Sequence, residues 1–118
     1  MLNVAILLLA IATVESGCND KLIGPKGERS QYQIMQGTFK RYTHAPFSMC
    51  RGLAATSVAT QHVSVIREKL VLGETSDPYA ISLVWKAGFR KHYGYRTHDY
   101  AQRVANTYNE LMRKEVRQ

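Results

Sequence analysis

The first 14 residues form an almost wholly apolar run that ends at Glu15-Ser16-Gly17. This run is shorter than the roughly 20 residues that a helix needs to cross a bilayer. Secretory leaders carry positive charge ahead of their apolar core, whereas the first lysine here is Lys21. We therefore expect residues 4–14 to form a helix that the fold buries on most sides, with Gly17 as its C-cap. A secretory leader is the alternative interpretation.

Hydrophobic spacing, together with glycine and proline, predicts further helices and no strands. Ser30 is a candidate N-cap for a short helix, Gly73 is a candidate end for a long one, and Pro78 and Gly88 bracket another. Residues 18–31 and the basic, aromatic residues 89–97 are predicted loops. The expected helices cover residues 32–42, 54–72, 78–87 and 98–116, the last with Tyr100, Val104, Tyr108 and Leu111 on one face.

The predicted helices make the fold mainly α, and the size suits one compact domain spanning residues 1–118. Apolar residues make up 45% and charged residues 21% of the chain, which excludes pervasive disorder and collagen-like sequence. The net charge of +7 favours an anionic partner: a nucleic acid, an acidic membrane or an acidic polymer.

Glu15 is the only acidic residue among the first 19, and it lies where the apolar helix is expected to end. Burial there would disfavour the carboxylate, and so would the negative end of the helix dipole. A carboxylic acid that stays neutral near pH 7 can act as a general acid. The alternative is a surface glutamate just outside the core.

Three blocks of the sequence follow one another in an order that is informative. Glu15-Ser16-Gly17 is followed by residues 24–38, which read Gly-Pro-Lys-Gly-Glu-Arg-Ser-Gln-Tyr-Gln-Ile-Met-Gln-Gly-Thr. Residues 81–88 read Ile-Ser-Leu-Val-Trp-Lys-Ala-Gly, and residues 100–108 carry Tyr-x-x-x-Val-x-x-x-Tyr. From about residue 5 to residue 111 the chain resembles the soluble lytic transglycosylases of the lysozyme-like superfamily.

This resemblance implies a lysozyme-like helical domain with a cleft that cuts peptidoglycan glycan strands. Glu15 would be the catalytic acid and then the base at the β-1,4 bond between N-acetylmuramic acid and N-acetylglucosamine. Gln33, Met35, Trp85 and Tyr100 would bind substrate in the cleft. The alternatives are an exposed polar role for Gln33 and core packing for Met35, Trp85 and Tyr100.

The chain departs from the family pattern at several cleft positions. Gln36 replaces a proline, Trp85-Lys86 replaces Tyr-Asn, and Gly24 replaces a hydroxyl residue of some members. The product therefore stays open between a 1,6-anhydro sugar and a hydrolysed one. Hydrolysis by two carboxyl groups would need a second acid, for which Asp20 and Glu28 are the candidates nearest in sequence.

Other function classes have weaker support. The basic, aromatic residues 86–103 have the composition of a nucleic-acid surface, but they also suit a face that settles on an anionic wall, and we expect no nucleic-acid partner. The alternatives are thus a wall-binding domain without activity and, less favoured, a nucleic-acid binder. The histidines, His44, His62, His92 and His98, have no i, i+4 spacing, so no metal is expected, and no cofactor motif appears.

The biological setting is constrained only loosely. An enzyme of this kind would act at the cell wall, and a phage lysis or virion protein or part of a secretion machine would suit a chain without a convincing export signal. No stable membrane insertion is expected. Cys18 and Cys50 are either one disulfide or two reduced thiols. The oligomeric state is not indicated by the sequence.

Overall fold

The computed structural model describes residues 1–71 and 77–117, and in that part of the chain helices account for all regular structure apart from isolated bridges. The mainly helical fold that the sequence predicts is thereby confirmed. The elements are α1 (Val4–Ser16), α2 (Gln36–Tyr42), the short 3-10 helix η1 (Phe47–Met49), α3 (Gly52–Val71), α4 (Pro78–Ala87) and α5 (Tyr95–Arg117).

Helix α1 is the buried helix that its apolar sequence predicts. The Asn3 side chain caps it by accepting a hydrogen bond from the Ile6 amide, and Gly17 ends it in the left-handed region at φ 63°. Leu7, Ala10 and Ile11 have no solvent exposure. Among the described residues, no helix is both long enough and apolar enough to cross a membrane.

The predicted start of the helix at residues 32–42 is wrong. Helix α2 begins at Gln36, and its N-cap residue Met35 makes no side-chain cap. Ser30 is instead a loop residue at φ 75°, and Gln33 lies at φ 53°, so the chain there cannot be helical. Bridges pair Arg29 with both Ile23 and Ile34, which holds this segment as a folded loop.

The other predicted boundaries differ by smaller amounts. Helix α4 runs from Pro78 to Ala87 with Gly88 as its C-cap, as predicted. Helix α5 begins at Tyr95 rather than His98, which shortens the predicted loop 89–97. Helix α3 begins at Gly52 instead of Ala54. Its predicted end at Gly73 lies outside the described residues.

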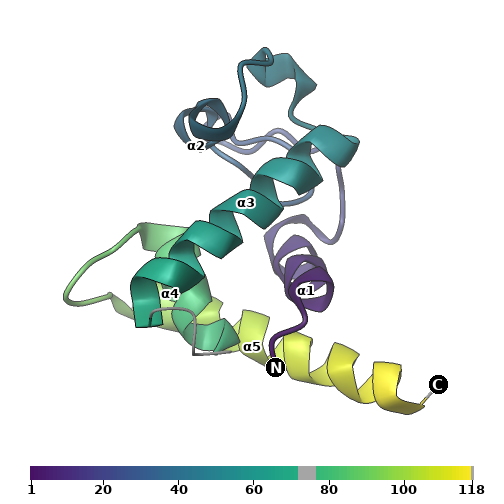
Figure 1. Ribbon diagram of the computed structural model, residues 1–118, viewed down its shortest axis with the longest axis vertical. Coiled ribbons are helices and arrows are strands. Elements are labelled where there is room, and N and C mark those ends of the chain that lie inside the picture. The colour runs from purple at the N-terminus through teal and green to yellow at the C-terminus, as the bar shows by residue number, and fades with distance from the viewer. Residues whose placement is uncertain (72–76, 118) are drawn as a thin grey trace.

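The helices are arranged so that the C-terminal helix supports the N-terminal one (Figure 1). Helix α5 packs against both α1 and α4, while α3 lies across α1, α2 and α4. The Tyr108 hydroxyl accepts a hydrogen bond from the backbone amide of Asn3 at 3.0 Å, and this bond connects α5 to the start of the chain. The predicted face of α5 is confirmed, since Tyr100, Val104 and Tyr108 are buried.

One apolar core runs through these contacts. Its largest fully buried side chain is that of Phe39 on α2, which meets the Phe47 ring at a centroid distance of 5.7 Å. Cys50 is buried and Cys18 is exposed, and both are free thiols. The disulfide alternative is therefore not the one that the structure adopts.

Candidate active site

The end of α1 is fastened to the loop that follows it through Ser16. The Ser16 hydroxyl donates a hydrogen bond to the Gln31 carbonyl oxygen at 2.8 Å and accepts one from the Asn19 amide at 3.0 Å. Because Gly17 turns the chain sharply at this point, the loop folds back over the last turn of α1. Ser16 and Gly17 thus shape the turn after α1, and Gln31 is brought beside the turn that carries Glu15.

Gln33 holds this loop in shape with its amide nitrogen. That nitrogen donates to the carbonyl oxygens of Ser30, at 2.8 Å, and Leu22, at 3.1 Å. Both N–H groups of the side chain are therefore used within the protein. The side-chain oxygen is the atom of Gln33 that can accept a hydrogen bond from a ligand.

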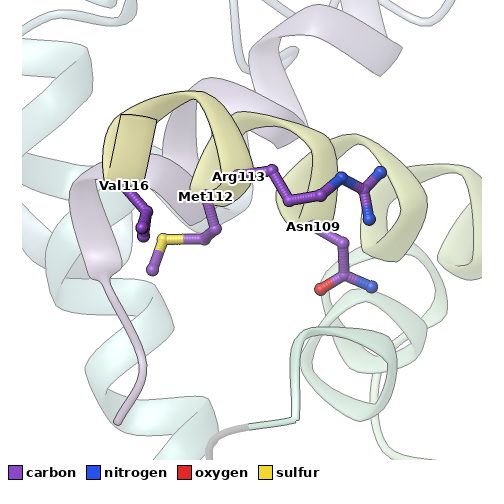
Figure 2. Close-up of a pocket in the computed structure, with 4 residues that line it drawn as sticks. All are labelled: Asn109, Met112, Arg113 and Val116. Atoms are coloured by element: carbon purple, nitrogen blue, oxygen red, sulfur yellow. The ribbon is translucent and has the colours of Figure 1, made fainter. Parts of the chain in front are cut away.

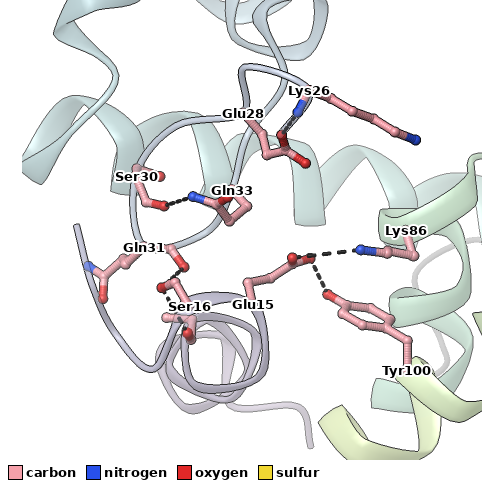
Figure 3. A network of polar contacts seen from close by, with 10 residues as sticks. Glu15, Ser16, Lys26, Glu28, Ser30, Gln31, Gln33, Lys86 and Tyr100 are labelled. Atoms are coloured by element: carbon pink, nitrogen blue, oxygen red, sulfur yellow. Dashed lines mark hydrogen bonds and ion pairs between the residues drawn. The ribbon is translucent and has the colours of Figure 1, made fainter. Parts of the chain in front are cut away.

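The carboxyl group of Glu15 points away from α1 toward α4 and α5 (Figure 3). The Tyr100 hydroxyl donates a hydrogen bond to Glu15 Oε2 at 2.9 Å. Lys86 Nζ lies 3.8 Å from Glu15 Oε1, and the Glu15 side chain is only 10% exposed. A single carboxyl from the start of the chain thus meets two groups from the last two helices.

The surroundings of Glu15 favour its neutral form. Burial raises the pKa of Glu15 above its ordinary value, and the nearby Glu28 carboxylate raises it further. The charge of Lys86 and hydrogen bonds from Tyr100 and Trp85 lower this pKa, but burial is the largest influence. The pKa of Tyr100 is raised well above its usual range by burial and by Glu15, so the phenol remains a hydrogen-bond donor.

A pocket of about 300 Å³ opens in front of this carboxyl group. That volume is at the lower end of small-molecule sites. Four residues predicted from the sequence meet here: Glu15, Gln33, Met35 and Trp85 all line the pocket, together with Lys26, Glu28 and Lys86. The fifth, Tyr100, is buried behind it and reaches the site through its bond to Glu15.

The structure separates the two candidates for a second acid. Asp20 accepts hydrogen bonds from the amides of Gln31 and Gly52, at 3.3 and 2.8 Å, and does not line the Glu15 pocket. Glu28 does line it, and its carboxylate accepts a hydrogen bond from the Lys26 amide at 2.7 Å. Asp20 therefore fixes the loop against α3, whereas Glu28 faces the same space as Glu15.

Lys86 lines the site although the sequence predicts no catalytic or substrate-binding role for it and shows it only as a departure from the family pattern. The sequence groups it with the basic residues 86–103, but it borders Glu15, and its ammonium lies 4.9 Å from the Tyr100 ring centroid. The available signal was its position beside Trp85, two residues before the Gly88 cap. Other members of that basic segment make local contacts: Arg103 pairs with Asp99, and the Tyr93 hydroxyl donates to the Gly88 carbonyl oxygen.

A second hollow lies near the end of α5, away from these residues (Figure 2). It is lined by Asn109, Met112, Arg113 and Val116, none of which carries a carboxyl, hydroxyl or imidazole group. It therefore offers no group for acid–base chemistry. In residues 1–71 and 77–117, no set of three or more histidine, cysteine or acidic side chains could hold a metal ion.

Comparison of the chain with protein-family models, with curated proteins and with solved structures finds no match. The reaction that the site can support is therefore inferred from the chemistry of its own residues. A half-enclosed pocket holds one buried carboxyl group whose pKa is raised, a phenol that orients it, and a partly buried indole. Such an arrangement can deliver a proton to a bound ligand and take it back.

Proposed function

We propose that this protein is a lysozyme-like enzyme that cuts the glycan strand of peptidoglycan, as a lytic transglycosylase with Glu15 as its single acid and base. The observation that carries the proposal is the pocket in which Glu15, buried and bonded to Tyr100, meets Gln33, Met35 and Trp85. These are the residues that the resemblance to soluble lytic transglycosylases assigns to catalysis and substrate binding.

In the first step, protonated Glu15 donates its proton to the glycosidic oxygen between N-acetylmuramic acid and N-acetylglucosamine. The bond from the muramic acid C1 to that oxygen breaks, and an oxocarbenium-like sugar remains. Burial raises the pKa of Glu15 and thereby favours the protonated form that this step requires. The Tyr100 hydroxyl stabilises the carboxylate that forms, because a hydrogen bond to the charged form favours it.

In the second step, the Glu15 carboxylate takes the proton of the sugar's own 6-hydroxyl, whose oxygen bonds to C1 and closes a 1,6-anhydro ring. Glu15 is then protonated again. Hydrolysis is the competing outcome, and Glu28 is the described acid that shares the pocket and could assist it. The flat face of Trp85 and the side-chain oxygen of Gln33 would hold the sugar ring.

The decisive experiment is mass spectrometry of purified peptidoglycan after incubation with the protein. Anhydro-muropeptides are the expected product. Fragments with reducing ends would instead identify a hydrolase, in which water attacks C1 with or without assistance from Glu28. Binding to the wall with no release of fragments would contradict an enzyme and identify the wall-binding alternative. Affinity for DNA that falls steeply with salt, without affinity for the wall, would identify a nucleic-acid binder.

Removing the charge of Lys86 should change the pH dependence of cleavage. Lys86 lowers the pKa of Glu15, so in Lys86→Met that pKa is higher and the protonated acid persists to higher pH. The alkaline limb of kcat/KM, where the general acid loses its proton, is therefore expected to move to higher pH. Lys91→Met is the matched control, since Lys91 is exposed and lies outside the pocket. An alkaline limb that moves down or stays fixed in Lys86→Met would contradict this assignment.

Gly24 is expected to matter mainly for the site and to a smaller extent for the stability of the loop around it. A Cβ atom at this position would lie 2.5 Å from Gln33 Oε1 and 2.5 Å from Glu28 Oε1, both at the ends of flexible side chains. Gly24→Ala should therefore displace these two groups and weaken the two hydrogen bonds of the Gln33 amide, lowering kcat/KM by roughly tenfold or more and the free energy of unfolding by about 1–2 kcal/mol. Gly37→Ala is the control, because its Cβ would meet nothing within 4 Å. Equal activities of the two variants would show that Gln33 and Glu28 need no fixed position.

A further inference from the structure

A groove of about 400 Å³, separate from the hollow near the end of α5, adjoins the Glu15 pocket. Met35, Trp85 and Lys86 line both spaces, so a strand bound in one can continue into the other. The groove lies between α2, α3 and α4 and is lined in addition by side chains such as Arg41, His62, Lys69 and Phe89. This groove is larger than the Glu15 pocket, and the resemblance to soluble lytic transglycosylases implies no role for Arg41, His62 or Lys69.

The charges in this groove are all of one sign. Arg41, Lys69 and Lys86 come from three different helices, and none of the described residues that line the groove is acidic. Within residues 1–71 and 77–117, no ion pair joins Arg41 or Lys69 to a carboxylate. Lys69 lies with its ammonium 5.7 Å from the centroid of the Phe89 ring. Among the described residues, Arg41 and Lys69 thus line the groove without a carboxylate to neutralise them, while Lys86 faces Glu15. This arrangement favours binding of an anion beside Arg41 and Lys69.

His62 forms part of the wall and adds no charge at neutral pH. Its Nδ1 is hydrogen-bonded to the Tyr42 hydroxyl at 2.7 Å, and its ring lies 5.4 Å from the Trp85 ring, centroid to centroid. Burial, with Arg41 and Lys69 nearby, lowers the pKa of His62 to about 4. The groove therefore combines a neutral aromatic wall, continuous with Trp85, and a cationic rim.

We propose that this groove binds carboxylate groups carried by the glycan strand, so that the enzyme selects strands by their negative charge as well as by their sugars. The inference rests on the proposed function. A peptidoglycan strand can present such carboxylates from two sources: the stem peptides, or the lactyl groups that become free when the peptides are removed. Arg41 and Lys69 are specificity-determining residues in this scheme, and Lys86 contacts both the groove and the catalytic acid.

The test compares the double variant Arg41→Gln/Lys69→Gln with Lys40→Gln/Lys91→Gln. Both variants lose two positive charges, but Lys40 and Lys91 are exposed and line neither space. Binding is measured by calorimetric titration in the Glu15→Gln background, so that no turnover is needed. The ligands are soluble strands that bear peptides, strands freed of peptides by an amidase, and uncharged chitin oligosaccharides.

The groove variant is expected to bind carboxylate-bearing strands roughly tenfold more weakly than the control variant, the loss expected for two solvent-exposed ion pairs. Both variants should bind chitin oligosaccharides equally. A loss confined to peptide-bearing strands identifies the stem peptides as the source of the carboxylates, and a loss confined to strands freed of peptides identifies the lactyl groups. An equal loss with both kinds of strand shows that the groove accepts carboxylates from either source.

Equal affinities of the two double variants for every strand would overturn the proposal, as would a loss of the same size with chitin oligosaccharides. Failure of the proposed function has a different signature. If the unmodified protein released no fragments but its binding still depended on Arg41 and Lys69, the proposed carboxylate binding would be supported and the proposed cleavage reaction would be contradicted. KM for cleavage should rise by the same factor as Kd in the groove variant, with kcat within twofold of the control.

Discussion

Glu15→Gln should abolish strand cleavage, lowering kcat by at least about 10²–10⁴-fold, the usual contribution of a positioned general acid or base. Glutamine has nearly the same shape as glutamate but carries no ionisable proton, so both proposed proton transfers are lost. Its side-chain oxygen can still accept the hydrogen bond of Tyr100, which lies 2.9 Å from the carboxylate oxygen. The variant should therefore fold, and circular dichroism with thermal melting checks this beside the release of muropeptides.

Glu28→Gln is the matched control for that experiment, since Glu28 lines the same pocket. With Glu15 acting alone, Glu28→Gln should retain most of the activity. A loss as large as that of Glu15→Gln would indicate a mechanism with two carboxyl groups and a hydrolysed product. Full activity of a correctly folded Glu15→Gln protein would contradict the proposed function outright.

Phe39→Ala should produce the largest loss of stability among single substitutions in α2, about 3–5 kcal/mol. Phe39 has no solvent exposure and packs against Phe47, and truncation would leave a cavity that its neighbours fill only in part. Because whole domains are stable by only about 5–15 kcal/mol, the melting temperature should fall by many degrees. Urea unfolding followed by circular dichroism measures the change.

Phe89→Ala removes the same atoms from a side chain that is 51% exposed, and it serves as the control. Its effect should stay near or below about 1 kcal/mol, the usual range for a position away from the core. Equal losses in the two variants would show that α2 is not anchored through Phe39. The consequence would reach the site, since Arg41 lies half a turn beyond Phe39 on the same helix.

The parts of the fold that follow from local chemistry are the parts that the sequence predicts correctly. The apolar run with Gly17 after it defines α1, and Pro78 and Gly88 define α4, because these residues act within one turn of their own position. The burial of Glu15 does not follow in this way, because Lys86 of α4 and Tyr100 of α5 are the groups that contact its carboxyl group. The structure adds what no local pattern contains: which residues meet that carboxyl group.

The predictions that the structure corrects, and the contacts that the sequence did not predict, also have physical causes. Ser30 and Gln33 adopt positive φ, which non-glycine residues rarely do, so the local sequence favours a helix where tertiary contacts hold a loop. Lys86 belongs by composition to a basic surface, and only the packing of α4 on α5 turns it toward Glu15. The grouping of Arg41, His62 and Lys69 in one groove depends on the crossing of α2 and α3, which hydrophobic spacing does not specify.

The hydrogen bond from Tyr100 to Glu15 joins residues 85 positions apart, and Tyr108 reaches Asn3 across 105. The acid and the loop over it are assembled from the first third of the chain, whereas the groups that enclose the acid come from the last third. On the ribosome, a nascent chain that has not yet released α5 would therefore carry a glutamate of ordinary acidity in open water. Reactivity would arise only once α5 has left the ribosome and docks against α1 and α4.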